Sequence, residues 1–294
     1  MPVALTGYAA ADKANHPQLS FGVIADPQYA DVNAAGTRHY RDSLGKLKTA
    51  AAELNKHDLK FLITLGDIID RDLASFKDIV PLYNLMMAPR KFVLGNHDFE
   101  VADADKGKVL DCLGMKQSYH SETLGDWCFI YLDGTDVSTY RNPKGSAETA
   151  SAMEVLEKMK QEKRNNARPW NGALGANQLK WFSAELDKAN SANQRVIVFN
   201  HYPIFPIGDG HNLWNDKEVV ELIEKHPNVV AYMNGHNHKG SYAVNKGCHY
   251  INFKGMVETK EMSAYAVVRC YADRIEVDGY ETEPDRTCLS GGRR

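Results

Sequence analysis

Side chains that could bind metal ions occur in five short segments of the chain, each directly after an apolar run. The segments offer carboxylate, amide and imidazole groups, and they contain no cysteine. Such hard oxygen and imidazole donors favour Mn²⁺, Fe, Zn²⁺ or Mg²⁺ over copper or an iron–sulfur cluster. The polar residues of these segments are Asp26, Gln28, Asp67, Asp70, Asn96, His97, Asp98, His201, His236 and His238.

This set is too large for one ion and suits two ions that share a bridging carboxylate. Two ions about 3.5–4 Å apart can hold both the attacking and the leaving oxygen of an in-line phosphoryl displacement. They also lower the pKa of a bound water, so that hydroxide becomes available near neutral pH. The residue types therefore predict metal-assisted phosphoryl chemistry if the fold brings the segments together.

Each segment also has a purely structural interpretation. An aspartate after a strand is a common turn or N-cap residue. The sequence Gly235-His236-Asn237-His238 could be a turn, since glycine and asparagine tolerate left-handed backbone. The joint occurrence favours function, because ligands of open α/β sheets bind beyond the carboxyl ends of the strands, where all five segments fall.

The elements that must position these residues alternate between strand and helix, which predicts the α/β class with parallel strands and right-handed crossovers. Apolar runs predict strands, and residues spaced three or four apart predict helices. The predicted strands cover residues 19–26, 59–67, 91–94, 195–199 and 229–233, and the predicted helices cover 40–54, 72–87 and 177–189.

The middle and the end of the chain follow other patterns. Residues 118–133 are typical of a hairpin, and residues 242–281 are rich in strand formers. Residues 148–166 predict a polar helix with Met153, Leu156 and Met159 on one face. Because no linker or repeat separates these parts, we expect one domain over residues 1–294, with a helical insertion or lid around 138–176.

Composition excludes several classes of function. The chain has 294 residues and a net charge of 35 − 38 = −3, so nonspecific binding to nucleic acid or membranes is not expected. No apolar run reaches the ~18 residues of a transmembrane helix. Five cysteines without a CxxC pair predict reduced, buried thiols. No signal peptide is visible, which makes a cytoplasmic location the default expectation, and the oligomeric state has no sequence signature.

The segments together resemble the calcineurin-like metallophosphoesterases. The resemblance rests on Asp26-x-Gln28, Gly66-Asp67-Ile68-Ile69-Asp70, Gly95-Asn96-His97-Asp98, Asn200-His201 and Gly235-His236-Asn237-His238, in this order. It implies an αββα sandwich of mixed sheets with helices on the outer faces. Gln28 departs from the usual family pattern, which has histidine there, and a neutral amide oxygen predicts a harder, weaker site for the first ion.

A narrower resemblance points to one subgroup, the manganese-dependent ADP-ribose/CDP-alcohol diphosphatases. It rests on residues 22–31, on Tyr40-Arg41-Asp42-Ser43-Leu44 and on Leu213-Trp214-Asn215. The implied reaction splits the diphosphate of a small nucleotide-type substrate such as ADP-ribose or CDP-choline, giving a nucleoside monophosphate and a phosphorylated sugar or alcohol. A cyclic nucleotide phosphodiesterase, a phosphomonoesterase and a non-catalytic scaffold of the same fold are the alternatives.

The resemblance also implies a role for each residue of the site. His97 would face the substrate phosphate, and Asp98 would either orient His97 or cap a helix. Two divalent ions are implied, with Mn²⁺ preferred and Fe, Zn²⁺ or Mg²⁺ as alternatives. One ion would be held by Asp26, Gln28, Asp67 and His238, and the other by Asp67, Asn96, His201 and His236.

Substrate contacts are expected from aromatic side chains close to the ligand segments. Exposed aromatic rings can stack on a nucleobase, which contributes ~1–3 kcal/mol for ordinary bases. Tyr29 and Trp214 also have a structural alternative, since Tyr29 could pack in its loop and Trp214 could anchor the next helix. The candidates are Tyr29, Phe205, His211 and Trp214.

Overall fold

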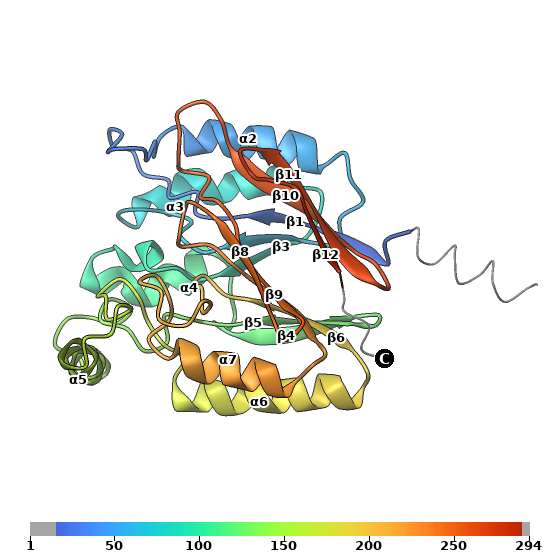
Figure 1. Cartoon of the computed structure of the whole chain (residues 1–294). Coiled ribbons are helices and arrows are strands. Elements are labelled where there is room, and N and C mark those ends of the chain that lie inside the picture. Colours follow the sequence, from blue (N-terminus) through green and yellow to red (C-terminus); the bar gives the residue numbers. More distant parts are fainter. Residues whose placement is uncertain (1–15, 290–294) are drawn as a thin grey trace, which may run out of the picture.

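Two six-stranded β-sheets lie face to face, and helices cover their outer surfaces (Figure 1). The computed structural model describes residues 16–289. The outer helices are α2 (Ser43–Leu54) and α3 (Ala74–Ile79) on the first sheet, and α6 (Ala176–Ser191) and α7 (Asp216–Lys225) on the second. This arrangement confirms the expected αββα sandwich.

The first sheet combines parallel strands from the start of the chain with antiparallel strands from its end. Strand β1 pairs in parallel with β2, and β2 pairs in parallel with β3. The remaining strands extend the sheet from the other side of β1 in antiparallel fashion. The order across the sheet is β12 (Arg286–Leu289), β11 (Arg274–Glu281), β10 (Ala264–Cys270), β1 (Leu19–Ile24), β2 (Leu62–Leu65) and β3 (Arg90–Val93).

The second sheet has a parallel centre with a hairpin at each edge. Strands β5, β6, β7 and β9 run parallel to one another, while the edge strands β4 and β8 pair antiparallel with β5 and β9. The order is β4 (His120–Leu124), β5 (Trp127–Tyr131), β6 (Arg195–Phe199), β7 (Val229–Asn234), β9 (Cys248–Asn252) and β8 (Ser241–Asn245). The expected hairpin over 118–133 is therefore confirmed.

The core between the sheets is aromatic and fully buried. Phe21 and Phe61 from the first sheet stack with ring centroids 4.8 Å apart, and both meet Phe129 of the second sheet edge-on. Burying an aromatic side chain of this size removes 150–250 Å² from water. This packing fixes the spacing of the two sheets and hence of the loops at their ends.

Two expectations about helices are wrong. The predicted helix over 72–87 divides into α3 and a 3₁₀ helix, η1 (Val80–Leu85), because Pro81 lacks the N–H that an α-helix needs. In α5 (Ala147–Gln161), Ala152, Leu156 and Met159 are buried, but the side chain of Met153 is 55% exposed because it lies off this face.

The remaining elements are short. They are the 3₁₀ helices η2 (His97–Phe99) and η3 (Asp103–Lys108) and the single-turn helix α4 (Val109–Cys112). All five cysteines are free thiols, and all except Cys112 are buried, as expected. Among residues 16–289, no helix is long and apolar enough to cross a membrane.

Candidate metal centre

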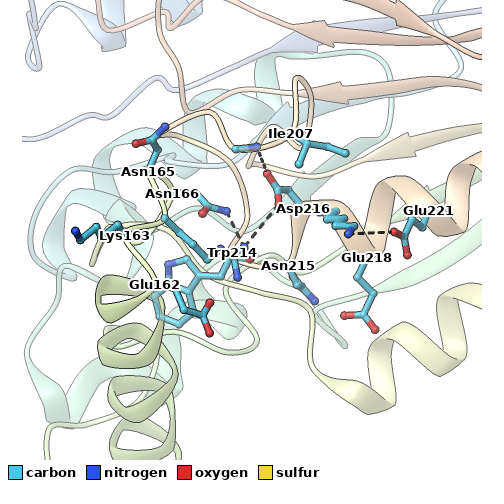
Figure 2. A pocket seen from close by; sticks show the side chains of 13 residues that line it. Glu162, Lys163, Asn165, Asn166, Ile207, Trp214, Asn215, Asp216, Glu218 and Glu221 are labelled. Atoms are coloured by element: carbon cyan, nitrogen blue, oxygen red, sulfur yellow. Dashed lines mark hydrogen bonds and ion pairs between the residues drawn. The ribbon is translucent and has the colours of Figure 1, made fainter.

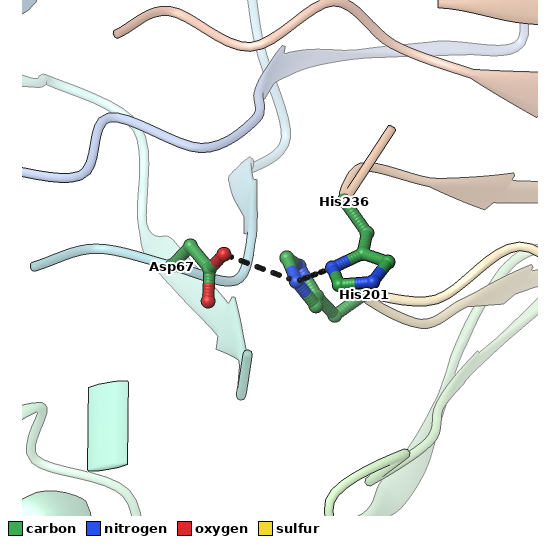
Figure 3. A group of neighbouring side chains, drawn as sticks. All are labelled: Asp67, His201 and His236. Atoms are coloured by element: carbon green, nitrogen blue, oxygen red, sulfur yellow. Dashed lines mark hydrogen bonds and ion pairs between the residues drawn. The ribbon is translucent and has the colours of Figure 1, made fainter. Parts of the chain in front are cut away.

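The loops after five strands meet at one edge of the sandwich and bring the predicted ligands together. Within each of two clusters, one ligand atom per residue lies within 4.8 Å of the others. One cluster is Asp67, His201 and His236 (Figure 3), and the other is Asp26, Asp67 and His238. Asp67 belongs to both clusters, which is the position that a bridging carboxylate would take.

Asp67 is the most strongly engaged carboxylate of the centre. Its Oδ2 lies 3.3 Å from Nε2 of His201, and its Oδ1 accepts the backbone N–H of His97 at 2.8 Å. Burial alone would raise the pKa of Asp67, but the neighbouring His201 and His97 hold that pKa well below its usual range. Asp67 therefore keeps its negative charge inside the protein and can share it between two cations.

The two candidate amide ligands have side-chain oxygen atoms without a hydrogen-bond partner among the described residues. Gln28 Oε1 and Asn96 Oδ1 are buried, and among the described residues neither has a hydrogen-bond partner. The Nε2 of Gln28 donates a hydrogen bond to Asp67 Oδ2 at 3.1 Å. The Oε1 of Gln28 is therefore the atom that remains available to bind a metal ion. Because an unpaired buried oxygen is costly, these atoms fit a centre that binds cations, as do the carboxylates and imidazoles around them.

Hydrogen bonds fix the rings of two candidate imidazole ligands. Nδ1 of His201 donates to the carbonyl of Leu65 at 2.7 Å, so its Nε2 points toward Asp67. Nδ1 of His238 lies 2.7 Å from Oε1 of Glu258, and its Nε2 lies 3.4 Å from Asp26. Partners of this kind set the tautomer and raise the basicity of a metal-binding histidine.

The backbone at the ligands is strained. Asp26, Gln28, Asp67 and His236 all have left-handed backbone, with φ of 49°, 43°, 51° and 69°. Residues other than glycine rarely adopt this region, and each instance costs about 1–3 kcal/mol. A Cβ atom at Gly95 would collide with the carboxylate of Asp67, so the close approach of the loops requires glycine there.

His97 lies near Asp67, and the carboxylate that meets its ring is not the expected Asp98. Its Nδ1 is 2.8 Å from Oδ1 of Asp70 and 3.2 Å from Glu100, while its Nε2 lies 3.4 Å from Nη1 of Arg38. Burial would lower the pKa of His97, but the carboxylates of Asp67 and Asp70 raise it well above its ordinary value. His97 can therefore carry a proton at neutral pH.

Asp98 has neither of its expected roles. Its carboxylate accepts the backbone N–H groups of Gly95, Asp67, Ile68 and Ile69, at 2.8–3.3 Å. It makes no side-chain cap bond for η2, and the carboxylate that faces the ring of His97 is that of Asp70. Asp98 instead joins the loop after β2 to the loop after β3, and so holds Asp67 near Asn96.

Three of the four expected substrate contacts have side chains engaged within the protein. Tyr29 is buried and donates its hydroxyl hydrogen to Asp78, so it packs in the core. Phe205 stacks on Tyr250 with centroids 4.8 Å apart. Trp214 is among the residues that line a pocket of about 630 Å³ (Figure 2), yet its side chain is buried and its Nε1 donates to the carbonyl of Arg168. Trp214 is thus an anchor.

His211 is the expected contact that lies near the clusters. Its ring centroid is 5.8 Å from that of His236, and its side chain is 46% exposed. The ring of His211 is therefore accessible from solvent beside a candidate ligand, which is where a substrate contact is needed.

Sequence reasoning missed Glu258 and the lysine that holds its loop. Nζ of Lys46 lies 2.6–3.3 Å from the carbonyl oxygens of Met256, Val257, Glu258 and Thr259. The same loop donates the N–H of Val257 to the carbonyl of Asp26 at 3.0 Å. Neither Lys46 nor Glu258 belongs to a motif, so no sequence signal marks them.

The chain is a sandwich of two mixed sheets, and its strand ends bring together two ligand clusters that share one carboxylate. This combination defines a metal-dependent phosphoesterase. Residues 19–240 match the family described as Calcineurin-like phosphoesterase, and the chain belongs to this family.

Relatives named for an enzymatic activity align over almost their whole length. A protein from Arabidopsis thaliana, "Manganese-dependent ADP-ribose/CDP-alcohol diphosphatase", is 31% identical over 90% of this chain and 95% of its own length. The protein of the same name from Xenopus tropicalis is 30% identical over 92% and 94%. A crystal structure of a dimetal phosphatase from Danio rerio has the same fold, with a TM-score of 0.84, 23% identity, and coverage of 94% of this chain and 100% of that one.

Proposed function

We propose that this protein hydrolyses the diphosphate bond of nucleoside diphosphate-linked compounds, of which ADP-ribose and CDP-alcohols such as CDP-choline are the examples. The products are a nucleoside monophosphate and a phosphorylated sugar or alcohol. Mn²⁺ is the proposed metal, in keeping with the carboxylate, amide and imidazole donors.

The observation that carries the proposal is the agreement between the centre and the named relatives. Both ligand clusters are present, and Gln28 supplies an amide beside Asp67 and His238 where other family members have histidine. Relatives named for this reaction match this chain over at least nine tenths of its length. A scaffold that had lost catalysis would have no need for a buried, strained ligand set.

The residues of the chain account for the steps of this reaction. A pair of divalent ions, when bound, supplies an activated water and positive charge for in-line attack on phosphorus. Asp67 would provide the shared negative charge that holds two cations close together. The Nδ1 of His97 meets Asp70 and its Nε2 lies beside Arg38, so Nε2 can donate a proton or a hydrogen bond to a phosphate oxygen.

Arg38 adds a positive charge on the same side of the centre. Its Nη1 lies 3.4 Å from Nε2 of His97. A guanidinium in this position can bind an oxygen of a phosphate that contacts His97. The leaving group of a diphosphate is a phosphate monoester, which leaves without strong acid assistance, so we expect His97 to act mainly by stabilising charge.

The competing function is hydrolysis of a cyclic nucleotide or a phosphate monoester by the same centre. A substrate panel with Mn²⁺ separates the two: ADP-ribose, CDP-choline, cyclic AMP and p-nitrophenyl phosphate, each with wild type and with Asp67→Asn as the control for contaminating activity. We expect Asp67-dependent release of AMP from ADP-ribose and of CMP from CDP-choline. Cleavage of cyclic AMP with inert diphosphates would overturn the proposal.

A further inference from the structure

His236 is the one candidate imidazole ligand whose ring is fixed by the expected insertion. Its Nε2 lies 3.0 Å from Oδ1 of Asn171, and its Nδ1 lies 3.0 Å from Nε2 of His201. Asn171 is fully buried. Because an amide oxygen only accepts hydrogen bonds, Nε2 of His236 carries the hydrogen and Nδ1 keeps the lone pair that a metal ion needs.

The amide of Asn171 cannot turn around. Its Nδ2 donates to the carbonyl of Asn166 at 3.1 Å and to the carbonyl of Gly210 at 2.9 Å. A flipped amide would place its oxygen against these two carbonyl oxygens and its NH₂ group against the N–H of His236. The three contacts together therefore define one orientation, with Oδ1 toward His236.

The segment that carries Asn171 is tied to the sandwich on both sides. Val137 and Ala173 exchange two backbone hydrogen bonds of 2.9 and 3.0 Å. Trp214 donates its backbone N–H to the carbonyl of Gly172 at 2.7 Å, and the side chain of Asn215 bonds both the N–H and the carbonyl of Leu174. Trp214 and Asn215, which line the pocket in Figure 2, thus hold this segment in place.

We propose that Asn171 is a positioning residue of the metal centre: it holds the ring of His236 in the tautomer that directs Nδ1 into the cluster formed with Asp67 and His201. The segment 166–174 is then a fixed wall of the centre rather than part of a movable lid. This role depends on the metal centre and not on the substrate, so a chain that proved inactive on ADP-ribose would leave it unaffected.

Two substitutions separate positioning from simple structural support. Asn171→Leu removes both the donors to Asn166 and Gly210 and the acceptor for His236. Asn171→Asp keeps the oxygen acceptor for His236, and its second oxygen, which burial favours in the protonated form, can donate to one of the two carbonyls. Mn²⁺ binding to the metal-free full chain is followed by calorimetry and by electron paramagnetic resonance. Loss of a residue that orients a metal-binding histidine typically weakens metal binding 10–100-fold, so we expect this loss for one of the two ions in Asn171→Leu and near-normal binding in Asn171→Asp.

A matched control is Asn212→Leu. Asn212 is also fully buried and donates from Nδ2 to Pro206 and Asp216, at 2.8 Å each, without touching a candidate ligand. We expect this variant to lose thermal stability and to keep the wild-type affinity for both ions.

The ring tautomer gives a readout that does not depend on bound metal. Long-range ¹H–¹⁵N spectra of the metal-free protein should show hydrogen on Nε2 of His236 in wild type and in Asn171→Asp, and a mixture of tautomers in Asn171→Leu. If Asn171→Asp weakens Mn²⁺ binding as much as Asn171→Leu does, or if the tautomer is the same in all three proteins, Asn171 only supports the fold and the proposal is wrong.

Discussion

Replacing Glu258 by glutamine should change both the strength and the pH dependence of metal binding at His238. Oε1 of Glu258 lies 2.7 Å from Nδ1 of His238. Burial would lower the pKa of His238, but Asp26 and Glu258 raise it to about 9, and the hydrogen bond from His238 lowers the pKa of Glu258 to about 2. In the metal-free protein, His238 is therefore protonated at pH 7, and a metal ion must displace that proton.

The magnitude follows from this pKa. At pH 7, two units below about 9, proton competition weakens binding about a hundredfold, or close to 3 kcal/mol. Affinity at this site should rise about tenfold per pH unit from 7 to 9 and then level off. Glu258→Gln removes one of the charges that raise the pKa, so affinity should level off at a lower pH. Loss of the orienting carboxylate should lower the plateau itself 10–100-fold.

These two effects oppose each other at pH 7 and not at pH 9. The deficit of Glu258→Gln in Mn²⁺ affinity should therefore be largest at pH 9 and smaller at pH 7. Calorimetric titrations at both pH values measure this deficit. They are done in a His201→Ala background, which removes a candidate ligand of the other cluster so that binding at His238 is observed alone. Glu224→Gln is the control, since within residues 16–289 the side chain of Glu224 bonds Asn245 and Lys246 and no candidate ligand.

Either of two outcomes refutes this reasoning. An equal deficit at pH 7 and pH 9 would mean that Glu258 does not set the proton affinity of His238. A deficit of the same size in Glu224→Gln would mean that general charge, and not the contact with His238, controls metal binding.

Four further outcomes are expected. Asp67→Asn should abolish turnover and lower the Mn²⁺ content, because the shared charge is lost; a metal assay and a rate measurement check this. His97→Ala should cut kcat 10²–10³-fold, by loss of charge stabilisation, with unchanged metal content, and full activity would contradict its role. Tyr29→Phe should cost about 1 kcal/mol of unfolding free energy, by loss of the bond to Asp78, with unchanged kcat/KM. When a chelator removes the metal ions, the raised pKa of His238 stabilises the folded state at pH values below 6.5, and this stabilisation is lost as the pH rises toward 9. The Tm of the metal-free protein should therefore fall from pH 6.5 to pH 9.

The clustering of the candidate metal ligands was predictable because each follows a strand that local patterning identifies. Apolar runs place Asp26 and Asp67 at strand ends, and parallel strands bring such ends to one edge. Glycine beside a polar residue, as at Gly95, marks a close approach of loops. The same reasoning gave the hairpin over 118–133, since alternation and a turn signal are local properties of the sequence.

The partners of the ligands were not predictable, because they come from loops without a periodic pattern. Glu258 lies 20 residues beyond His238 and reaches it only through a loop held by the buried Lys46. Asn171 reaches His236 across 65 residues. For Asp98, adjacency to His97 misled the prediction: the carboxylate turns to the backbone N–H groups instead, and Asp70 from another loop meets the ring.

The two sheets contribute different chemistry to the centre. The loops after β1, β2 and β3 of the first sheet provide every oxygen donor, namely Asp26, Gln28, Asp67 and Asn96, whereas the loops after β6 and β7 of the second provide His201, His236 and His238. Cations bound there would therefore bridge the two sheets. A shift of one sheet relative to the other would separate the oxygen ligands from the imidazole ligands in both clusters. Metal binding, and with it catalysis, therefore depends on the alignment of the two sheets.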